Sequence, residues 1–156
     1  MPIPALDLHG FLPNGVHICT IEEIENTFCW NEHRSKIWRG GLKFLSKLIT
    51  RDMAFPIYVD GSFITDKKLP GDVDIVLDLT QADDFKQFIG VKMFQSEREI
   101  IKMEYCVDFC PNLPGNNDFS AFFQYIGPKM ATIKGLNDKY RKGILRVESW
   151  QTGLNK

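Results

Sequence analysis

The sequence predicts an α+β fold, in which a small mixed or antiparallel sheet packs on helices. Three observations favour this class. Segments 21–30 and 32–50 place apolar residues at helical spacing. Segment 72–79 alternates apolar with acidic or polar residues, as a half-buried strand does. Helical and strand segments then alternate along the rest of the chain, and this mixing is typical of a small sheet covered by helices.

The N-terminal third is expected to be an arm followed by two helices. Residues 1–19 are predicted as an extended arm with a turn, because they hold two early prolines and a Pro-Asn-Gly sequence. The helical region, 20–51, opens on Thr20 and Glu23, which have the spacing of a capping box. Its second helix has a broad apolar face and an opposite face of basic residues, which are Lys36, Arg39, Lys43, Lys47 and Arg51.

The region 56–110 is predicted as the catalytic core, and 111–156 as a C-terminal helix and strand. The expected core elements are a strand at 57–60, a loop at 61–71, a strand at 72–79, a helix at about 82–88 capped by Thr80, and a strand region at 99–110. After them we expect a short helix at about 118–125 and a last strand at 143–149, while 127–142 carries no clear pattern. The chain, 1–156, is thus predicted as a single domain.

Length and composition exclude several classes of protein. The chain has 156 residues, of which 44% are apolar and 25% are charged, as in an ordinary ordered domain. Its formal net charge of -1 argues against a general nucleic-acid coat, although a local basic stripe remains compatible with it. No apolar run approaches the ~18 residues of a membrane span, and the N-terminus lacks a signal-peptide pattern. We therefore expect a cytoplasmic protein with no membrane partner.

Three aspartates are the candidate catalytic and metal-binding residues. Asp72 and Asp74 are expected to project from one face of their strand, and a hard cation such as Mg²⁺ stabilises two carboxylates this close. Asp108 is a lone carboxylate in an apolar run. If its strand neighbours that of Asp72, the three acids could hold two metal ions, Mg²⁺ or alternatively Mn²⁺. Glu104 shares a strand face with Asp108 by parity, so it is a second candidate for the third acid, weaker than Asp108.

The loop before Asp72 is the candidate nucleotide-binding segment. Gly61 lets the backbone approach a phosphate closely, and Ser62 offers a hydroxyl and an amide. Lys67 and Lys68 lie in the same loop, where either could stabilise the charge of a triphosphate. The alternative interpretation is that both are ordinary loop lysines.

The combination of these motifs resembles a known family. Gly61-Ser62, nine intervening residues and then Asp72-Val73-Asp74 is similar to the signature of the polymerase-beta-like nucleotidyltransferases, with Asp108 as the matching third acid. The string 59–74 resembles still more closely a group of short, standalone nucleotidyltransferase-like proteins of bacteria and phages. Segments 12–17 and 142–145 also resemble that group.

The resemblance implies a nucleotidyltransferase-like core and the roles of its residues. Gly61 and Ser62 would hold the β- and γ-phosphates of an NTP, and the first two acids, Asp72 and Asp74, would bind metal. Asp108 would help to activate an acceptor hydroxyl. An NMP would be transferred and pyrophosphate would leave.

Three functions remain open from the sequence. The first is Mg²⁺-dependent transfer of an NMP from an NTP to a hydroxyl of RNA, protein or, less favoured, a small molecule. The second, by analogy, is a toxin or antitoxin component of a bacterial or phage conflict system. The third is a non-catalytic nucleotide- or RNA-binding module of the same fold. The candidate acceptor or RNA contacts are Lys36, Arg39, Lys43 and Lys47, unless these form a solvated helix face.

Overall fold

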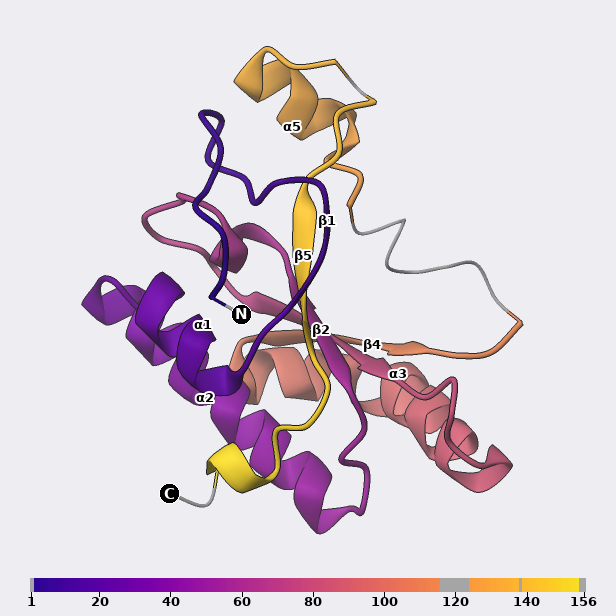
Figure 1. The fold of residues 1–156 in the computed structure, drawn as a ribbon. Coiled ribbons are helices and arrows are strands. Elements are labelled where there is room, and N and C mark those ends of the chain that lie inside the picture. The colour runs from indigo at the N-terminus through magenta and orange to yellow at the C-terminus, as the bar shows by residue number, and fades with distance from the viewer. Residues whose placement is uncertain (1, 116–123, 138, 155–156) are drawn as a thin grey trace.

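A five-stranded mixed sheet with helices on one side forms the body of the molecule (Figure 1). The computed structural model describes residues 2–115, 124–137 and 139–154. The strands lie in the order β1-β5-β2-β3-β4. The β1–β5 and β3–β4 pairs are parallel, and the β5–β2 and β2–β3 pairs are antiparallel. The strands are β1 (Gly15–Ile18), β2 (Ile57–Asp60), β3 (Val73–Asp78), β4 (Val107–Asn112) and β5 (Gly143–Val147). The predicted α+β class is confirmed.

The helices α1 (Ile21–Phe28) and α2 (Glu32–Thr50) form where the apolar periodicity predicted them. The capping box at the start of α1 is confirmed, because Thr20 accepts from the Glu23 amide and the Glu23 side chain accepts from the Thr20 amide. The long helix α3 (Asp84–Tyr105) packs beside α2, and α5 (Gly127–Lys134) lies apart from them beyond one end of β5 (Figure 1).

The hydrophobic core lies between the sheet and the helices α1, α2 and α3. Alternate residues of β3 are fully buried on this side, and they are Val73, Ile75 and Leu77. Phe44 of α2 packs edge-on against Phe109 of β4, with ring centroids 5.5 Å apart. At Gly40 an added Cβ would lie 2.2 Å from the Tyr105 carbonyl oxygen, so the glycine lets α2 approach the end of α3.

The prediction of a strand over 99–110 was wrong in its first half. Residues up to Tyr105 belong to α3, which is far longer than the helix expected at 82–88, and the chain turns at Cys106 with φ of 57°. The run from Ile100 to Cys110 is apolar enough to fit either structure, and no glycine or proline marks the boundary. Glu104 is consequently an exposed helical residue and does not share a strand face with Asp108.

Two other predicted elements differ from the structure. The arm 1–19 contains strand β1, which pairs with β5 at the edge of the sheet. Asp83, not Thr80, caps α3, because the Thr80 hydroxyl donates instead to Asp78.

The helix expected at 118–125 falls almost wholly outside the described residues. The stretch 127–142, which carried no clear pattern, contains α5. In the part of the chain that the structure describes, no helix is long and apolar enough to cross a membrane.

Candidate metal and nucleotide site

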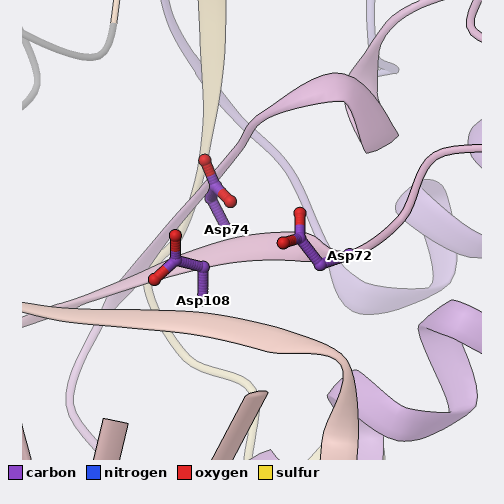
Figure 2. A group of neighbouring side chains, drawn as sticks. All are labelled: Asp72, Asp74 and Asp108. Carbon is purple, nitrogen blue, oxygen red and sulfur yellow. The ribbon is translucent and has the colours of Figure 1, made fainter. Parts of the chain in front are cut away.

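Three carboxylates converge at one end of strands β3 and β4 (Figure 2). Asp74 of β3 and Asp108 of β4 are direct partners in the parallel register, so their side chains share a face of the sheet. Asp72 lies two residues before Asp74 and therefore projects from that face as well. One oxygen from each of the three carboxylates lies within 4.8 Å of the others. The structure thus brings together the three aspartates that the sequence singled out.

A fourth acid, Asp60, extends this row onto the neighbouring strand. It pairs with Asp74 across β2 and β3, so Asp60, Asp74 and Asp108 lie side by side on three strands. Asp60 is only 2% exposed, and the Lys142 Nζ lies 2.6 Å from its Oδ1. The sequence offered one signal for Asp60, its place at the end of a strand directly before Gly61. For Lys142 it offered only the resemblance of segment 142–145 to the short nucleotidyltransferase-like proteins, which does not point to an ion pair with Asp60.

The acids that flank Asp74 each have a cationic partner. Lys142 pairs with Asp60, Arg98 lies 3.1 Å from the Asp108 Oδ1, and Lys102 lies 3.3 Å from the Asp72 Oδ2. Among the described residues, Asp74 has no ion-pair partner. The central carboxylate is therefore the one of the four that no cation of the described residues contacts directly, although Lys142 attracts it from its place beside Asp60.

The electrostatics of Asp74 favour binding of a cation. Burial, followed by repulsion from Asp60, Asp72 and Asp108, raises the pKa of Asp74 to about 7. Burial also raises the pKa of Asp60, although Lys142 opposes this. A divalent ion among these carboxylates would supply the positive charge that the cluster lacks. An all-carboxylate oxygen donor set suits Mg²⁺ or Mn²⁺, so the residues present fit the metal that the sequence predicts.

The Gly-Ser turn lies directly against Asp74. Gly61 has φ of 87° and ψ of -169°, a backbone conformation that is essentially restricted to glycine. An added Cβ at Gly61 would lie 2.9 Å from the Asp74 carboxyl carbon. Ser62 then begins a short 3-10 helix, and its carbonyl accepts from both the amide and the hydroxyl of Thr65. The turn is therefore fixed in shape and adjoins the central acid.

A cavity of about 540 Å³ opens beside the turn and Asp74. One part of its wall is polar, with Asp60, Ser62 and Asp74 beside the cations Lys67, Lys134 and Lys142. The other part is largely apolar, with Phe11, Ile126, Met130 and Ile133. Of the two lysines predicted from the loop, Lys67 lines this cavity, while Lys68 is not among its lining residues.

A buried arginine, which sequence reasoning missed, holds the loop that carries Lys67. Arg34 of α2 is fully buried and donates to the backbone carbonyls of Phe63, Thr65 and Lys67 in the loop, and to that of Phe28. Its guanidinium lies 4.8 Å from the ring centroid of Phe63. Burial lowers the pKa of Arg34. Because an arginine within a helix usually marks an exposed position, nothing in the sequence signalled this role.

The basic stripe of α2 is not part of the acidic site. Lys36, Arg39, Lys43 and Lys47 are all exposed, and none forms an ion pair with the three acids. Lys43 lines a groove among α1, α2 and the C-terminal segment, and Lys47 lines a small groove between α2 and α3. Neither groove includes Asp72, Asp74 or Asp108. A role of the stripe in acceptor binding stays a prediction.

The fold and the site together define a mixed α+β protein with a row of carboxylates across three adjacent strands, β2, β3 and β4. The chain belongs to DUF6932, a family of unknown function, whose model matches residues 4–148. Comparisons with curated proteins and with solved structures found no match.

Replacing Gly61 by alanine tests whether the turn shapes the site. We expect the variant to lose about 1–3 kcal/mol of folding free energy and to bind Mg²⁺ and nucleotide more weakly, because a side chain is strained there and collides with Asp74. Urea unfolding and nucleotide titration measure these effects. The control is Gly71→Ala in the same loop, where an added Cβ meets nothing within 4 Å. Equal behaviour of the two variants would contradict the role of Gly61.

Proposed function

We propose that the protein is a Mg²⁺-dependent nucleotidyltransferase that transfers an NMP from an NTP to an acceptor hydroxyl. The observation that carries the proposal is the convergence of Asp72, Asp74 and Asp108, with Asp74 lacking a cationic partner among the described residues. The cavity beside Asp74 supports it, since a volume of about 540 Å³ with a lysine-rich part and an apolar part suits a nucleotide. The toxin, antitoxin and non-catalytic alternatives stay predictions from the sequence.

The residues of this chain have separate tasks in the proposed reaction. Ser62 and Lys67 lie where they can bind the triphosphate, and Lys142 adds a further positive charge to the same wall of the cavity. The carboxylates of Asp72, Asp74 and Asp108 would hold Mg²⁺. When bound, the metal would supply positive charge for the phosphate oxygens and the attacking oxygen.

The bonds that change are those of an in-line phosphoryl substitution. The acceptor oxygen forms a bond to the α-phosphorus, the bond from the α-phosphorus to the bridging oxygen breaks, and pyrophosphate leaves. The hydroxyl proton must pass to a base. Asp108 is our candidate, because it belongs to the cluster yet does not line the nucleotide cavity.

Incubation with each α-labelled NTP, Mg²⁺ and a cell lysate tests the proposal. We expect label to enter one class of macromolecule, and we expect EDTA, Asp72→Asn and Asp74→Asn each to abolish the labelling. Circular dichroism checks that both variants remain folded. Labelling that persists in EDTA or survives both substitutions would contradict the proposed function.

A further inference from the structure

Two cations of α3 contact the acidic cluster at acids that do not line the cavity. Arg98 and Lys102 are four residues apart and so lie on the same face of the helix. Arg98 contacts Asp108 at 3.1 Å, and Lys102 contacts Asp72 at 3.3 Å. Neither cation lines the nucleotide cavity, and neither do the two acids that they contact.

The order of the strands separates the two sides of the site. The cavity includes Asp60 of β2 and Asp74 of β3, whereas Asp108 lies on β4, the strand that directly follows α3 in the chain. A nucleotide in the cavity would therefore meet the cluster at Asp60 and Asp74 and would leave Asp72 and Asp108 to their contacts with Lys102 and Arg98. Because the attacking and leaving oxygens of phosphoryl transfer lie roughly in line, the acceptor hydroxyl has to arrive opposite the pyrophosphate. With the pyrophosphate in the cavity, the acceptor would meet the cluster at Asp72 and Asp108, the two acids that contact Lys102 and Arg98.

We propose, on the basis of the proposed function, that the acceptor is a single-stranded nucleic-acid end whose phosphates bind Arg98 and Lys102. The arginine and lysine side chains are 50% and 56% exposed, so solvent and a ligand can reach both. Arg98 also lies 4.9 Å from the ring centroid of Phe94, which limits the positions of its guanidinium. A polyanion with phosphates next to its reacting hydroxyl matches two such cations better than a neutral protein surface does.

The same contacts couple acceptor binding to metal binding. Without metal, Arg98 and Lys102 neutralise part of the charge of Asp108 and Asp72. A divalent ion on these carboxylates would take over that neutralisation and repel both cations. In both pairs the cation is about half exposed and the acid about a quarter exposed, so solvent weakens the pairs and their release costs little free energy. We therefore expect the acceptor to bind more tightly once Mg²⁺ and the nucleotide are in place.

The test is binding of a fluorescent 12-nucleotide single-stranded RNA with a free 3′ hydroxyl. It is measured with Mg²⁺ and a non-hydrolysable ATP analogue at several salt concentrations. Log affinity falls as log salt rises, and loss of two phosphate contacts from a single strand makes this slope shallower by about 1.4. We expect Arg98→Ala/Lys102→Ala to show this change and at least tenfold weaker binding. The control, Lys86→Ala/Lys92→Ala, removes the same charge from the first half of α3 and should keep the wild-type slope.

Several outcomes would overturn this proposal. An unchanged slope in the Arg98→Ala/Lys102→Ala variant would do so, as would an equal loss in the control. If RNA binding weakens in Lys43→Ala/Lys47→Ala and not in Arg98→Ala/Lys102→Ala, the acceptor binds at α2 and not at α3. Transfer of label to protein, without RNA binding, would show that the acceptor is a protein and not a nucleic acid.

Titration of the ATP analogue with Mg²⁺ distinguishes failure of the acceptor proposal from failure of the proposed function. Wild-type protein that binds the analogue but not RNA refutes only the acceptor, whereas protein that does not bind the analogue refutes the proposed function.

Discussion

Replacing Asp74 by asparagine is expected to abolish nucleotidyl transfer and, in metal-free buffer at pH 8, to make the protein more stable. Asparagine keeps the shape of the side chain but cannot carry the negative charge that would bind the metal. It also relieves a cost, because burial and the neighbouring Asp60, Asp72 and Asp108 disfavour the ionised form of Asp74. Loss of activity together with gain of stability is the result expected when a residue serves function at a cost to folding stability.

The pH dependence of this stabilisation follows from the direction of the pKa shift. The pKa of Asp74 is about 7 in the folded protein against an ordinary 3.8. The contribution of the protonated carboxyl to stability is therefore complete below pH 3.8 and is lost as the pH rises through 7. At pH 8 Asp74 is ionised in the wild-type protein, and the full cost of this ionisation is subtracted from the free energy of unfolding. At 1.36 kcal/mol per pKa unit, the upper bound of this cost is about 4 kcal/mol. At pH 5 most of the difference between wild type and Asp74→Asn should disappear.

Urea unfolding of the metal-free proteins at pH 5 and pH 8 measures this effect. Asp78→Asn is the matched control, because Asp78 lies on the same strand and the same face as Asp74 but is paired. Its carboxylate accepts from Arg146 at 2.9 Å and from the Thr80 hydroxyl at 2.8 Å. We therefore expect Asp78→Asn to destabilise the protein at pH 8. If both substitutions shift the free energy of unfolding in the same direction, the electrostatic account of Asp74 is wrong.

Replacing Arg34 by methionine is expected to cost about 3 kcal/mol or more of folding free energy. Methionine retains much of the apolar volume but leaves the carbonyls of Phe63, Thr65 and Lys67 without their donor. Loss of a buried polar partner is among the few changes that destabilise a protein this strongly. We also expect weaker nucleotide binding, because these carbonyls fix the loop that carries Lys67 into the cavity.

The control for Arg34→Met is Arg39→Met on the same helix. The Arg39 side chain is 59% exposed, and its partner Glu32 is 3.8 Å away, so its loss should change the free energy of unfolding by less than about 0.5 kcal/mol. Urea unfolding and nucleotide titration of the two variants measure both effects. A destabilisation by Arg34→Met no larger than that by Arg39→Met would show that the buried arginine does not hold the loop.

The sequence predicted the parts of the fold that depend on local pattern. The helices α1 and α2 and the strands β2 and β3 follow from apolar periodicity over one segment each. The shared face of Asp72 and Asp74 follows from the alternation of side chains along a strand. The prediction that Asp108 joins Asp72 and Asp74 held only if β4 lies beside β3. No local pattern determines which strands pair.

The features that the sequence did not predict depend on contacts between distant segments. Strand β1 is a four-residue edge strand whose partner, β5, lies near the other end of the chain. Lys142 meets Asp60 only because β5 pairs with β2. Arg98 and Lys102 reach the acids only because α3 continues to Tyr105, where the sequence suggested a strand. The same error placed Glu104, rather than the two cations, near the site.

The most direct test of the central claim is calorimetric titration of the protein with Mg²⁺ at pH 6, 7 and 8. We expect saturable binding that Asp74→Asn abolishes and Asp78→Asn retains. We also expect release of protons, measured from the dependence of the heat on the buffer, because Mg²⁺ displaces the proton from Asp74. This release should diminish as the pH rises from 6 to 8. Absence of Mg²⁺ binding to the wild-type protein, or equal binding by Asp74→Asn, would contradict a metal site at these carboxylates.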